Sequence, residues 1–431
     1  MSIPSPTAAG PLDFLSRLGR LWVGAPLWAR ILLGLLLGAA AGLALGDSAA
    51  QLKWIGDVFV RLIRMLVTPL VFVTVVAGVA AMADPARLGS VGAKTLFLYF
   101  ALMLVASALG LTLATLIRPG EGVDLAGVAP QAVGSPEPLN RMLMDIVPLN
   151  PVAALAEGDM LAVIFFALMI GLAILTVGEE AGPVRTVFDS ASAVLMRMVR
   201  FVMELAPFGV FALIAWVMGT SGPSAFVSIF KLAICVLAGA VIQTVIVHGG
   251  LLRLLARLPV VPFFRDIADA IVVAFSTSSS AAALPVAMRV AQKNLGVSPA
   301  VASTVLPIGV TLSMDGTAMY VGMLAVFSAQ VFGVNLALAD YLAIMAVTTL
   351  VAMGTAPVPS ASLFLLAAVL SVIGLGPEQT ALIVGFILPF DRPLDMIRTV
   401  PNCTSDLSVC VAVARWEGDL DIDAYMAKPV E

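Results

Sequence analysis

Near its C-terminus the chain reads PFDRPLDMIRTVPNCTSD over residues 389–406. On a helix with about 100° per residue, six polar residues of this stretch fall within an arc of roughly 100°. They are Asp391, Asp395, Arg398, Thr399, Asn402 and Asp406. The rest of the helix is largely apolar, and so charged a face cannot meet lipid. We therefore expect it to meet protein, water or a ligand.

The residues of this polar face suit a ligand that carries charges of both signs. Arg398 offers a planar fork that can bind a carboxylate through two hydrogen bonds. Asp395, about one turn earlier, would pair with an ammonium group, and Thr399 would hydrogen bond beside either. Asp406, about two turns later, is a hard oxygen ligand for a small cation. The residues alone leave a second interpretation open, in which Arg398 only neutralises Asp395 in a structural network.

Composition indicates a membrane protein. The chain has 431 residues, of which 61% are hydrophobic and 12% are charged, and its mean hydropathy is +1.07. A soluble domain is about 25% charged. The apolar runs are continuous, without the period-two alternation of a barrel, which favours helices. The net charge of −4 and the lack of a basic block argue against nucleic acid. Cys235, Cys403 and Cys410 lack the spacing of a disulfide framework or zinc site.

The first part of the chain predicts six membrane helices within residues 27–256. Residues 1–26 read as a cytoplasmic segment, because Arg17, Arg20 and Arg30 precede or begin the first apolar run. We expect a multi-pass protein of the inner cell membrane with both termini in the cytoplasm. Residues 416–431, which are rich in acidic side chains, read as a solvated cytoplasmic tail. His248, in the sixth segment, reads as an interfacial residue.

The second part of the chain predicts two interrupted segments, 262–295 and 338–375. Each is long enough for two passes, yet each has a polar centre: Ser276 to Ser280 in the first, and Gly354 to Ser362 in the second. Non-helical backbone at membrane depth must be buried in protein or line an aqueous cavity. Two half-helices that meet at a polar tip satisfy this demand, and such pairs indicate a transporter's binding site. Two ordinary helix–loop–helix pairs with exposed turns remain the alternative.

A further polar cluster interrupts the segment 298–327, and the last helix is predicted over 378–415. The cluster is Ser313-Met314-Asp315-Gly316-Thr317. Carbonyl groups freed by a helix break can coordinate a cation, with Asp315 supplying charge. The same aspartate could instead cap a kink or carry a proton.

Together these motifs resemble the dicarboxylate/amino acid:cation symporters, which include the excitatory amino acid transporters. The resemblance spans nearly the whole chain: Arg64 to Phe72, Val147 to Pro151, the serine-rich tip, Met314 to Thr317, the second tip and the last helix. It implies an all-α polytopic membrane protein with eight transmembrane helices, two re-entrant hairpins and inverted repeats. It also implies a homotrimer that works as an elevator: hairpin 1 (262–295), hairpin 2 (338–375, the gate) and helices 3, 6, 7 and 8 would move against the remaining scaffold.

The resemblance also implies roles for individual residues. Asp395 matches the position that holds the substrate amino group, and Arg398 the one that holds its side-chain carboxylate. The other matching substrate contacts are Thr399, Asn402, Ser279, Ser280, Thr317 and Val358. Because both Asp395 and Arg398 are present, L-aspartate or L-glutamate is the expected substrate, without a preference between them. Neither Ser278 nor Met396 supplies the second arginine found at one or other of these places in relatives.

For the coupling ions, the resemblance implies sodium and no other cofactor. The first sodium site would be built on Asp406, with Gly309, Asn402 and Ser313. The second would be built on Thr311 and Thr355. In the third, Tyr99 and Asp315 match, but Leu102 and Met103 replace polar residues and offer no side-chain oxygen. We therefore expect fewer coupled sodium ions, with Asp315 protonated or paired elsewhere.

Two other functions stay open on the sequence. One is a proton-coupled carrier of acidic amino acids or a carrier of C4-dicarboxylates. The other is an intramembrane hydrolase that uses Asp315 with Asp395, or a serine of the first tip; the serines have no evident base, so we expect no enzyme. The effects of Pro357, Ser360, Ser362 and Pro401, which depart from the family pattern, and any anion leak, are not predicted.

Overall fold

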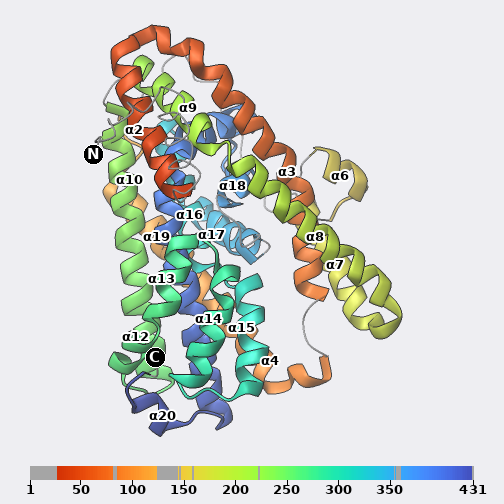
Figure 1. Ribbon diagram of the computed structural model, residues 1–431. Helices are drawn as coiled ribbons and strands as arrows, with labels where there is room; N and C mark the ends of the chain where they lie inside the picture. Colours follow the sequence, from red (N-terminus) through yellow and green to blue (C-terminus); the bar gives the residue numbers. More distant parts are fainter. Residues whose placement is uncertain are drawn as a thin grey trace, which may run out of the picture.

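The fold is a bundle of helices (Figure 1). The computed structural model describes residues 27–80, 85–123, 144, 147–157, 160–221, 224–353, 355 and 361–429. No β-strand occurs in these ranges; Val297 and Leu420 form an isolated bridge. This agrees with the all-helical class expected from the continuous apolar runs.

The first half of the chain forms long helices. They are α2 (Leu27–Leu45), a 3-10 turn (Gly46–Leu52), α3 (Lys53–Ala80), α4 (Pro85–Ile117), α6 (Pro151–Glu157), α7 (Met160–Val177), a 3-10 turn (Gly178–Ala181), α8 (Gly182–Met203), α9 (Ala206–Ser221) and α10 (Ser224–Val241). After α10 the helix continues through two π-helical segments, Ile242–Val247 and Leu251–Leu255, with α11 (His248–Gly250) between them. Each π segment shifts the side chains that follow relative to ordinary helical spacing.

The second half is made of shorter paired helices and one long helix. They are α12 (Val260–Asp266), α13 (Ala268–Thr277), α14 (Ser280–Lys293), α15 (Pro299–Leu312), α16 (Asp315–Val331), α17 (Leu338–Met353), α18 (Ala361–Ser371), α19 (Pro377–Glu417) and α20 (Ile422–Met426). The pair α13–α14 lies within predicted hairpin 1 and the pair α17–α18 within predicted hairpin 2. The polar tip of hairpin 2 lies outside the described residues except for Thr355 and the start of α18.

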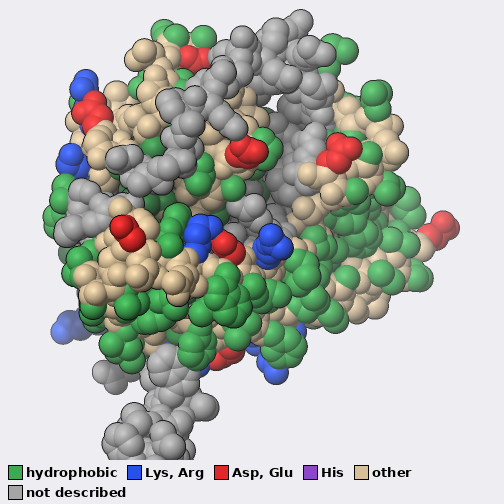
Figure 2. Space-filling view, turned by 90° about the horizontal axis from the view of Figure 1, so that it is seen from above, with side chains coloured by type: hydrophobic (Ala, Val, Ile, Leu, Met, Phe, Trp, Pro, Cys, Tyr) green, Lys and Arg blue, Asp and Glu red, His purple; other side chains and the backbone are tan. Residues whose placement is uncertain are grey.

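Several helices have the length and composition of membrane spans. Five stretches of the described residues qualify: Ala29–Phe59, Ser90–Ile117, Phe165–Val202, Val227–Leu255 and Pro299–Val331. Large apolar side chains stay exposed on them, for example on α2, α4 and the π-helical segment after α10, where Leu36, Phe97 and Ile246 are more than half exposed. Hydrophobic side chains cover much of the molecule's rim in Figure 2, and charged ones are few. Such a surface suits lipid rather than water.

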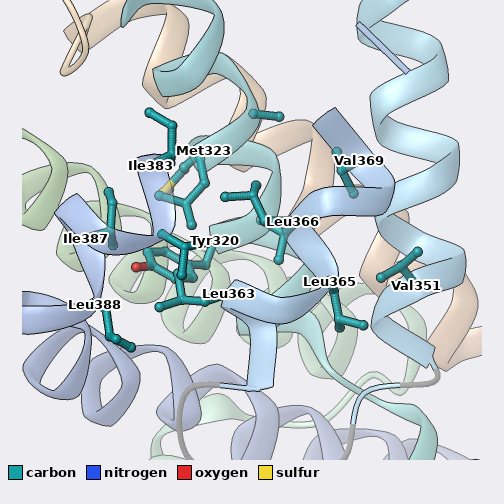
Figure 3. Packing of buried hydrophobic residues seen from close by; sticks show 14 of the residues in the cluster. Tyr320, Met323, Val351, Leu363, Leu365, Leu366, Val369, Ile383, Ile387 and Leu388 are labelled. Carbon is teal, nitrogen blue, oxygen red and sulfur yellow. The ribbon is translucent and has the colours of Figure 1, made fainter. Parts of the chain in front are cut away.

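One apolar stretch is instead enclosed by protein. Every residue of α16 from Asp315 to Ala329 is buried. α16 packs against α4, α17, α18 and α19. Figure 3 shows side chains of α16, α18 and α19 that point toward one another, among them Tyr320, Met323, Leu363, Leu366, Ile383 and Ile387. This core packs α16 against α18 and the first half of α19.

The C-terminal tail differs from the solvated segment expected from its acidic residues. Tyr425 of α20 is fully buried, and its hydroxyl donates a hydrogen bond to the Pro259 carbonyl, 2.8 Å away. The backbone N–H of Asp421 donates to the Gly296 carbonyl at 2.8 Å. Asp419, Asp421 and Asp423 of the tail are exposed, and Glu417 pairs with Lys94. The ring of Tyr425 anchors the tail against α12, at the lower end of the molecule in Figure 1.

Candidate functional site

The tip of hairpin 1 is a tight, polar turn between α13 and α14. Ser278 has left-handed backbone angles (φ 53°, ψ 40°), which are uncommon for a residue other than glycine and are often found at functional sites. Ser279 caps α14, because its Oγ accepts a hydrogen bond from the Ala282 N–H at 3.3 Å. Ser280 opens α14 and is buried. The Ser278 hydroxyl is also buried, and among the described residues it has no hydrogen-bond partner.

The break between α15 and α16 is held against α19. The backbone leaves the helix at Ser313 (φ −92°, ψ 101°). Three residues later the N–H of Gly316 donates to Asn402 Oδ1 at 2.7 Å, and Ser313 Oγ donates to Ser405 Oγ at 3.0 Å. Thr317, in the first turn of α16, is also buried. The start of α16 is thus tied to the polar face of α19 by two hydrogen bonds.

A network of buried charges lies at the centre of that face. Arg398 Nε donates to Asp395 Oδ1 at 2.9 Å, and Nη2 lies 2.7 Å from the same oxygen. Its Nη1 lies 3.6 Å from Asp391 Oδ1 and donates to the Ser362 hydroxyl of α18. Its guanidinium sits 4.5 Å from the ring centre of Tyr320, whose hydroxyl donates to Asp391 at 3.0 Å. A charge network so deeply buried needs every partner, and losing one typically destabilises it strongly.

All six polar residues of the α19 face are buried, as expected for a face that cannot meet lipid. Thr399 Oγ1 donates to the backbone carbonyl of Asp395 at 2.7 Å. Arg398 therefore neutralises Asp395, as the structural interpretation requires. The same geometry also presents a cation and an anion side by side, and an amino acid with an acidic side chain could exchange its own carboxylate and ammonium into this pair. Both interpretations are compatible with the contacts.

Oxygen atoms suited to a cation converge at Gly309. Asp406 Oδ1 is buried without a hydrogen-bond partner among the described residues. A methyl group added to Gly309 would collide both with this oxygen and with the Tyr99 hydroxyl. A buried carboxylate oxygen without a donor, next to a backbone that must remain bare, fits the sodium site expected on Asp406.

The two threonines expected at the second sodium site, Thr311 and Thr355, each donate a hydrogen bond to a nearby carbonyl of their own segment. Thr311 Oγ1 donates within its own helix, to Pro307 and Ile308 carbonyls at 3.1 and 2.9 Å. Thr355 Oγ1 likewise donates to the Val351 carbonyl at 3.2 Å. Val358, expected to contact substrate, lies outside the described residues.

The third predicted sodium position offers few side-chain oxygens, although Asp315 Oδ1 is buried there without a hydrogen-bond partner among the described residues. Leu102 and Met103 are buried there and bring no side-chain oxygen. Asp315 Oδ2 accepts a hydrogen bond from Gln243 Nε2 at 3.0 Å and lies 3.3 Å from His248 Nε2. Protein groups thus occupy this oxygen where an ion would bind, and Tyr99 turns its hydroxyl toward the Val305 carbonyl at 3.3 Å.

The interfacial assignment of His248 is therefore wrong. Its side chain is fully buried, with Nδ1 3.1 Å from Ser408 Oγ. It sits at the junction of the two π-helical segments, and π-bulges are frequent at functional sites. A polar residue inside a membrane segment is a functional candidate by default, a criterion that also points to Gln243.

Two further residues of this site, Ser362 and Arg392, were not predicted from the sequence. Ser362 was noted only as a departure from the gate pattern, yet it contacts Arg398. Arg392 belongs to the stretch 389–406 but lies just outside the arc of its six polar residues. Its Nη2 donates to the Thr277 carbonyl at 3.3 Å. A count of side-chain charges in this helix, rather than of one face, would have found Arg392.

Comparisons with known proteins show the family of the chain. The model of the sodium:dicarboxylate symporter family matches residues 27–416. The C4-dicarboxylate transport protein of Anaeromyxobacter sp. (strain K) is 37% identical over 92% of this chain and 90% of its own length. The proton/glutamate-aspartate symporter of Bacillus subtilis (strain 168) is 34% identical over 90% and 94%, and the proton/sodium-glutamate symport protein of Geobacillus stearothermophilus is 32% identical over 90% and 94%. The chain thus belongs to the sodium:dicarboxylate symporter family, and it is a multi-pass membrane transporter and not an enzyme.

Proposed function

We propose that the protein is a secondary active symporter that imports L-aspartate or L-glutamate together with sodium ions. The observation that carries this proposal is the buried pair of Asp395 and Arg398, 2.7 Å apart, between the two hairpins and the broken helix. The pair offers one partner for an ammonium group and one for a carboxylate. Ser279, Ser280, Thr317, Thr399 and Asn402 would complete the substrate site.

Sodium is proposed as the coupling ion because Asp406 Oδ1 is buried without a hydrogen-bond partner among the described residues. Asp406, with Gly309, Asn402 and Ser313, would hold one sodium ion, and Thr311 with Thr355 another. Because Gln243 and His248 lie against Asp315, we propose two coupled sodium ions rather than three. A measured ratio of three sodium ions to one substrate would refute this part.

The mechanism is proposed on family grounds. Eight transmembrane helices, two re-entrant hairpins and a trimeric scaffold would let the substrate domain move as an elevator, with hairpin 2 as gate. Both termini would lie on the cytoplasmic side of the inner membrane. The broken helices α15 and α16 support this, because discontinuous helices commonly form substrate and ion sites in transporters.

A second candidate is a carrier of C4-dicarboxylates or a proton-coupled carrier. It is favoured by the names of the relatives, one a C4-dicarboxylate transport protein and one a proton/glutamate-aspartate symporter. Asp395 decides between the substrate classes, because a dicarboxylate without an amino group gains nothing from a carboxylate in the site.

The test is uptake of labelled L-aspartate into proteoliposomes, under a sodium gradient and separately under a proton gradient. We expect sodium alone to drive uptake and Arg398→Ala to abolish it, while Arg185→Ala, on the exposed side of α8, serves as the control. Uptake driven by protons alone would refute sodium coupling. Uptake of succinate without aspartate would refute the role of Asp395.

A further inference from the structure

Arg392 lies where the tip of hairpin 1 meets α19. Its side chain is only 10% exposed, and its Nη2 donates to the carbonyl of Thr277, the last residue of α13, at 3.3 Å. Its Nη1 lies 3.8 Å from Asp395 Oδ2. Among the described residues, its Nε and Nη1 have no hydrogen-bond partner.

These unused donors are costly in a buried position. Arginine stays charged in proteins and carries five N–H donors in a rigid fork. A buried donor without a partner costs free energy, and more so when it is charged. As a clamp between α19 and hairpin 1, Arg392 would use one hydrogen bond to Thr277 and a longer ion pair with Asp395 Oδ2, 3.8 Å away, which leaves the Nε side of the fork unexplained. A carboxylate is the group that a planar fork accepts best.

Arg392 and Arg398 approach different oxygens of the Asp395 carboxylate. Arg398 engages Asp395 Oδ1, together with Ser362 of α18. Arg392 approaches the other oxygen of Asp395, beside the tip of hairpin 1. The two guanidinium groups thus flank Asp395, one with each hairpin. The unpartnered Ser278 hydroxyl belongs to the same tip as Thr277.

We propose that Arg392 binds a carboxylate of the substrate at the tip of hairpin 1. Resting on the proposed function, this assigns the α-carboxylate to Arg392, the side-chain carboxylate to Arg398 and the ammonium group to Asp395. Two arginines and two aspartates (Asp391 and Asp395) balance before the substrate arrives. Aspartate or glutamate then adds one net negative charge to a buried site, which a coupled cation would neutralise.

The test removes one carboxylate from the protein's ligand and one arginine from the protein in turn. Equilibrium binding is measured for L-aspartate, for β-alanine, which lacks its α-carboxylate, and for L-alanine, which lacks its side-chain carboxylate. The proteins are wild type, Arg392→Gln, Arg392→Lys and Arg398→Gln. Arg289→Gln is the matched control, because Arg289 is 45% exposed and pairs with Asp269 across the arms of the same hairpin at 2.8 Å.

We expect Arg392→Gln to weaken L-aspartate about 10- to 100-fold, the usual range for a hydrogen bond to a charged group. Its affinity for β-alanine should stay unchanged, because the carboxylate that Arg392 holds is missing from that ligand. Arg398→Gln should instead spare L-alanine, and Arg392→Lys, which keeps charge but loses the fork, should fall between wild type and glutamine. The control should match wild type with every ligand.

Equal losses for all three ligands in Arg392→Gln would overturn the proposal and leave Arg392 a structural clamp, as would wild-type affinity for L-aspartate. If wild type binds succinate but not L-aspartate, the amino acid function fails, and the same comparison is run with succinate and propionate. There, a selective loss for succinate supports Arg392 as a carboxylate ligand, and an equal loss overturns it. Binding of none of these ligands would overturn both proposals.

Discussion

The contact between Gly316 and the Arg398 carbonyl sets the distance between α16 and α19, so a methyl group at Gly316 tests the site directly. A Cβ added to Gly316 would overlap the carbonyl oxygen of Arg398 and lie 2.8 Å from its carbonyl carbon. Carbon atoms pack best about 3.5–4.0 Å apart, so the two backbones would have to separate by roughly 0.7–1.2 Å. The hydrogen bond from the Gly316 N–H to Asn402 would lengthen with them.

We expect Gly316→Ala to weaken aspartate binding and uptake about 100-fold, because a displacement of about 1 Å can cost that much in a preorganised site. Overpacking should also lower the free energy of unfolding by about 1–3 kcal/mol. The assays are equilibrium binding of labelled L-aspartate and a thermal melt in detergent. Gly385→Ala in α19 is the control, because a Cβ there meets nothing within 4 Å. Wild-type affinity in Gly316→Ala would refute the claim that this contact sets the site.

Three further perturbations probe other contacts. Gln243→Leu removes the 3.0 Å donor of Asp315 and should lower the free energy of unfolding by about 1–3 kcal/mol; an unchanged melting temperature would contradict this. Lys94 donates to Glu417 and holds the pKa of that carboxyl below its usual 4.5. The stability that this pair adds is therefore fully present above the unfolded-state pKa of 4.5, and it is lost as the pH falls through the lower pKa of the folded state. The melting temperature of wild type should exceed that of Glu417→Gln at pH 7, with a gap that closes in acid; a gap independent of pH counts against the pairing. Gly38→Ala places a Cβ 2.5 Å from a carbonyl oxygen of α9 and should lower the melting temperature but not the aspartate affinity, and a matching loss of affinity would show that this packing reaches the site.

The polar face of α19 could be read from spacing alone, because a helix repeats with a fixed angle per residue. The polar face was therefore expected to meet protein, water or a ligand rather than lipid, and its six polar residues are buried. The helix break at Ser313 and Met314 was equally visible, since an aspartate and a glycine interrupt an apolar segment. The all-helical class followed from the length of the apolar runs.

Local spacing could not show how distant segments meet. His248 was misassigned because the π-helical segment before it, Ile242–Val247, shifts its side chain relative to ordinary helical spacing, and no short-range pattern reveals that segment. Its neighbour Asp315 lies 67 positions further along the chain, and Gln243 reaches the same carboxylate from 72 positions away. The proposed role of Arg392 likewise depends on its contact with the Thr277 carbonyl of hairpin 1, which is distant from α19 in the sequence.

The amino-acid sequence by itself determined that this protein is a helical membrane transporter with a charged helix in its interior, because hydropathy and helical period are local properties. Only the tertiary structure decided which charges are paired and which donors remain unused. The physical reason is that a buried ionic group must find its partners across the bundle, and packing alone selects them. The clearest cases are Asp315, whose Oδ2 accepts a hydrogen bond from Gln243, and Arg392, whose Nε and Nη1 have no hydrogen-bond partner in the described part of the chain.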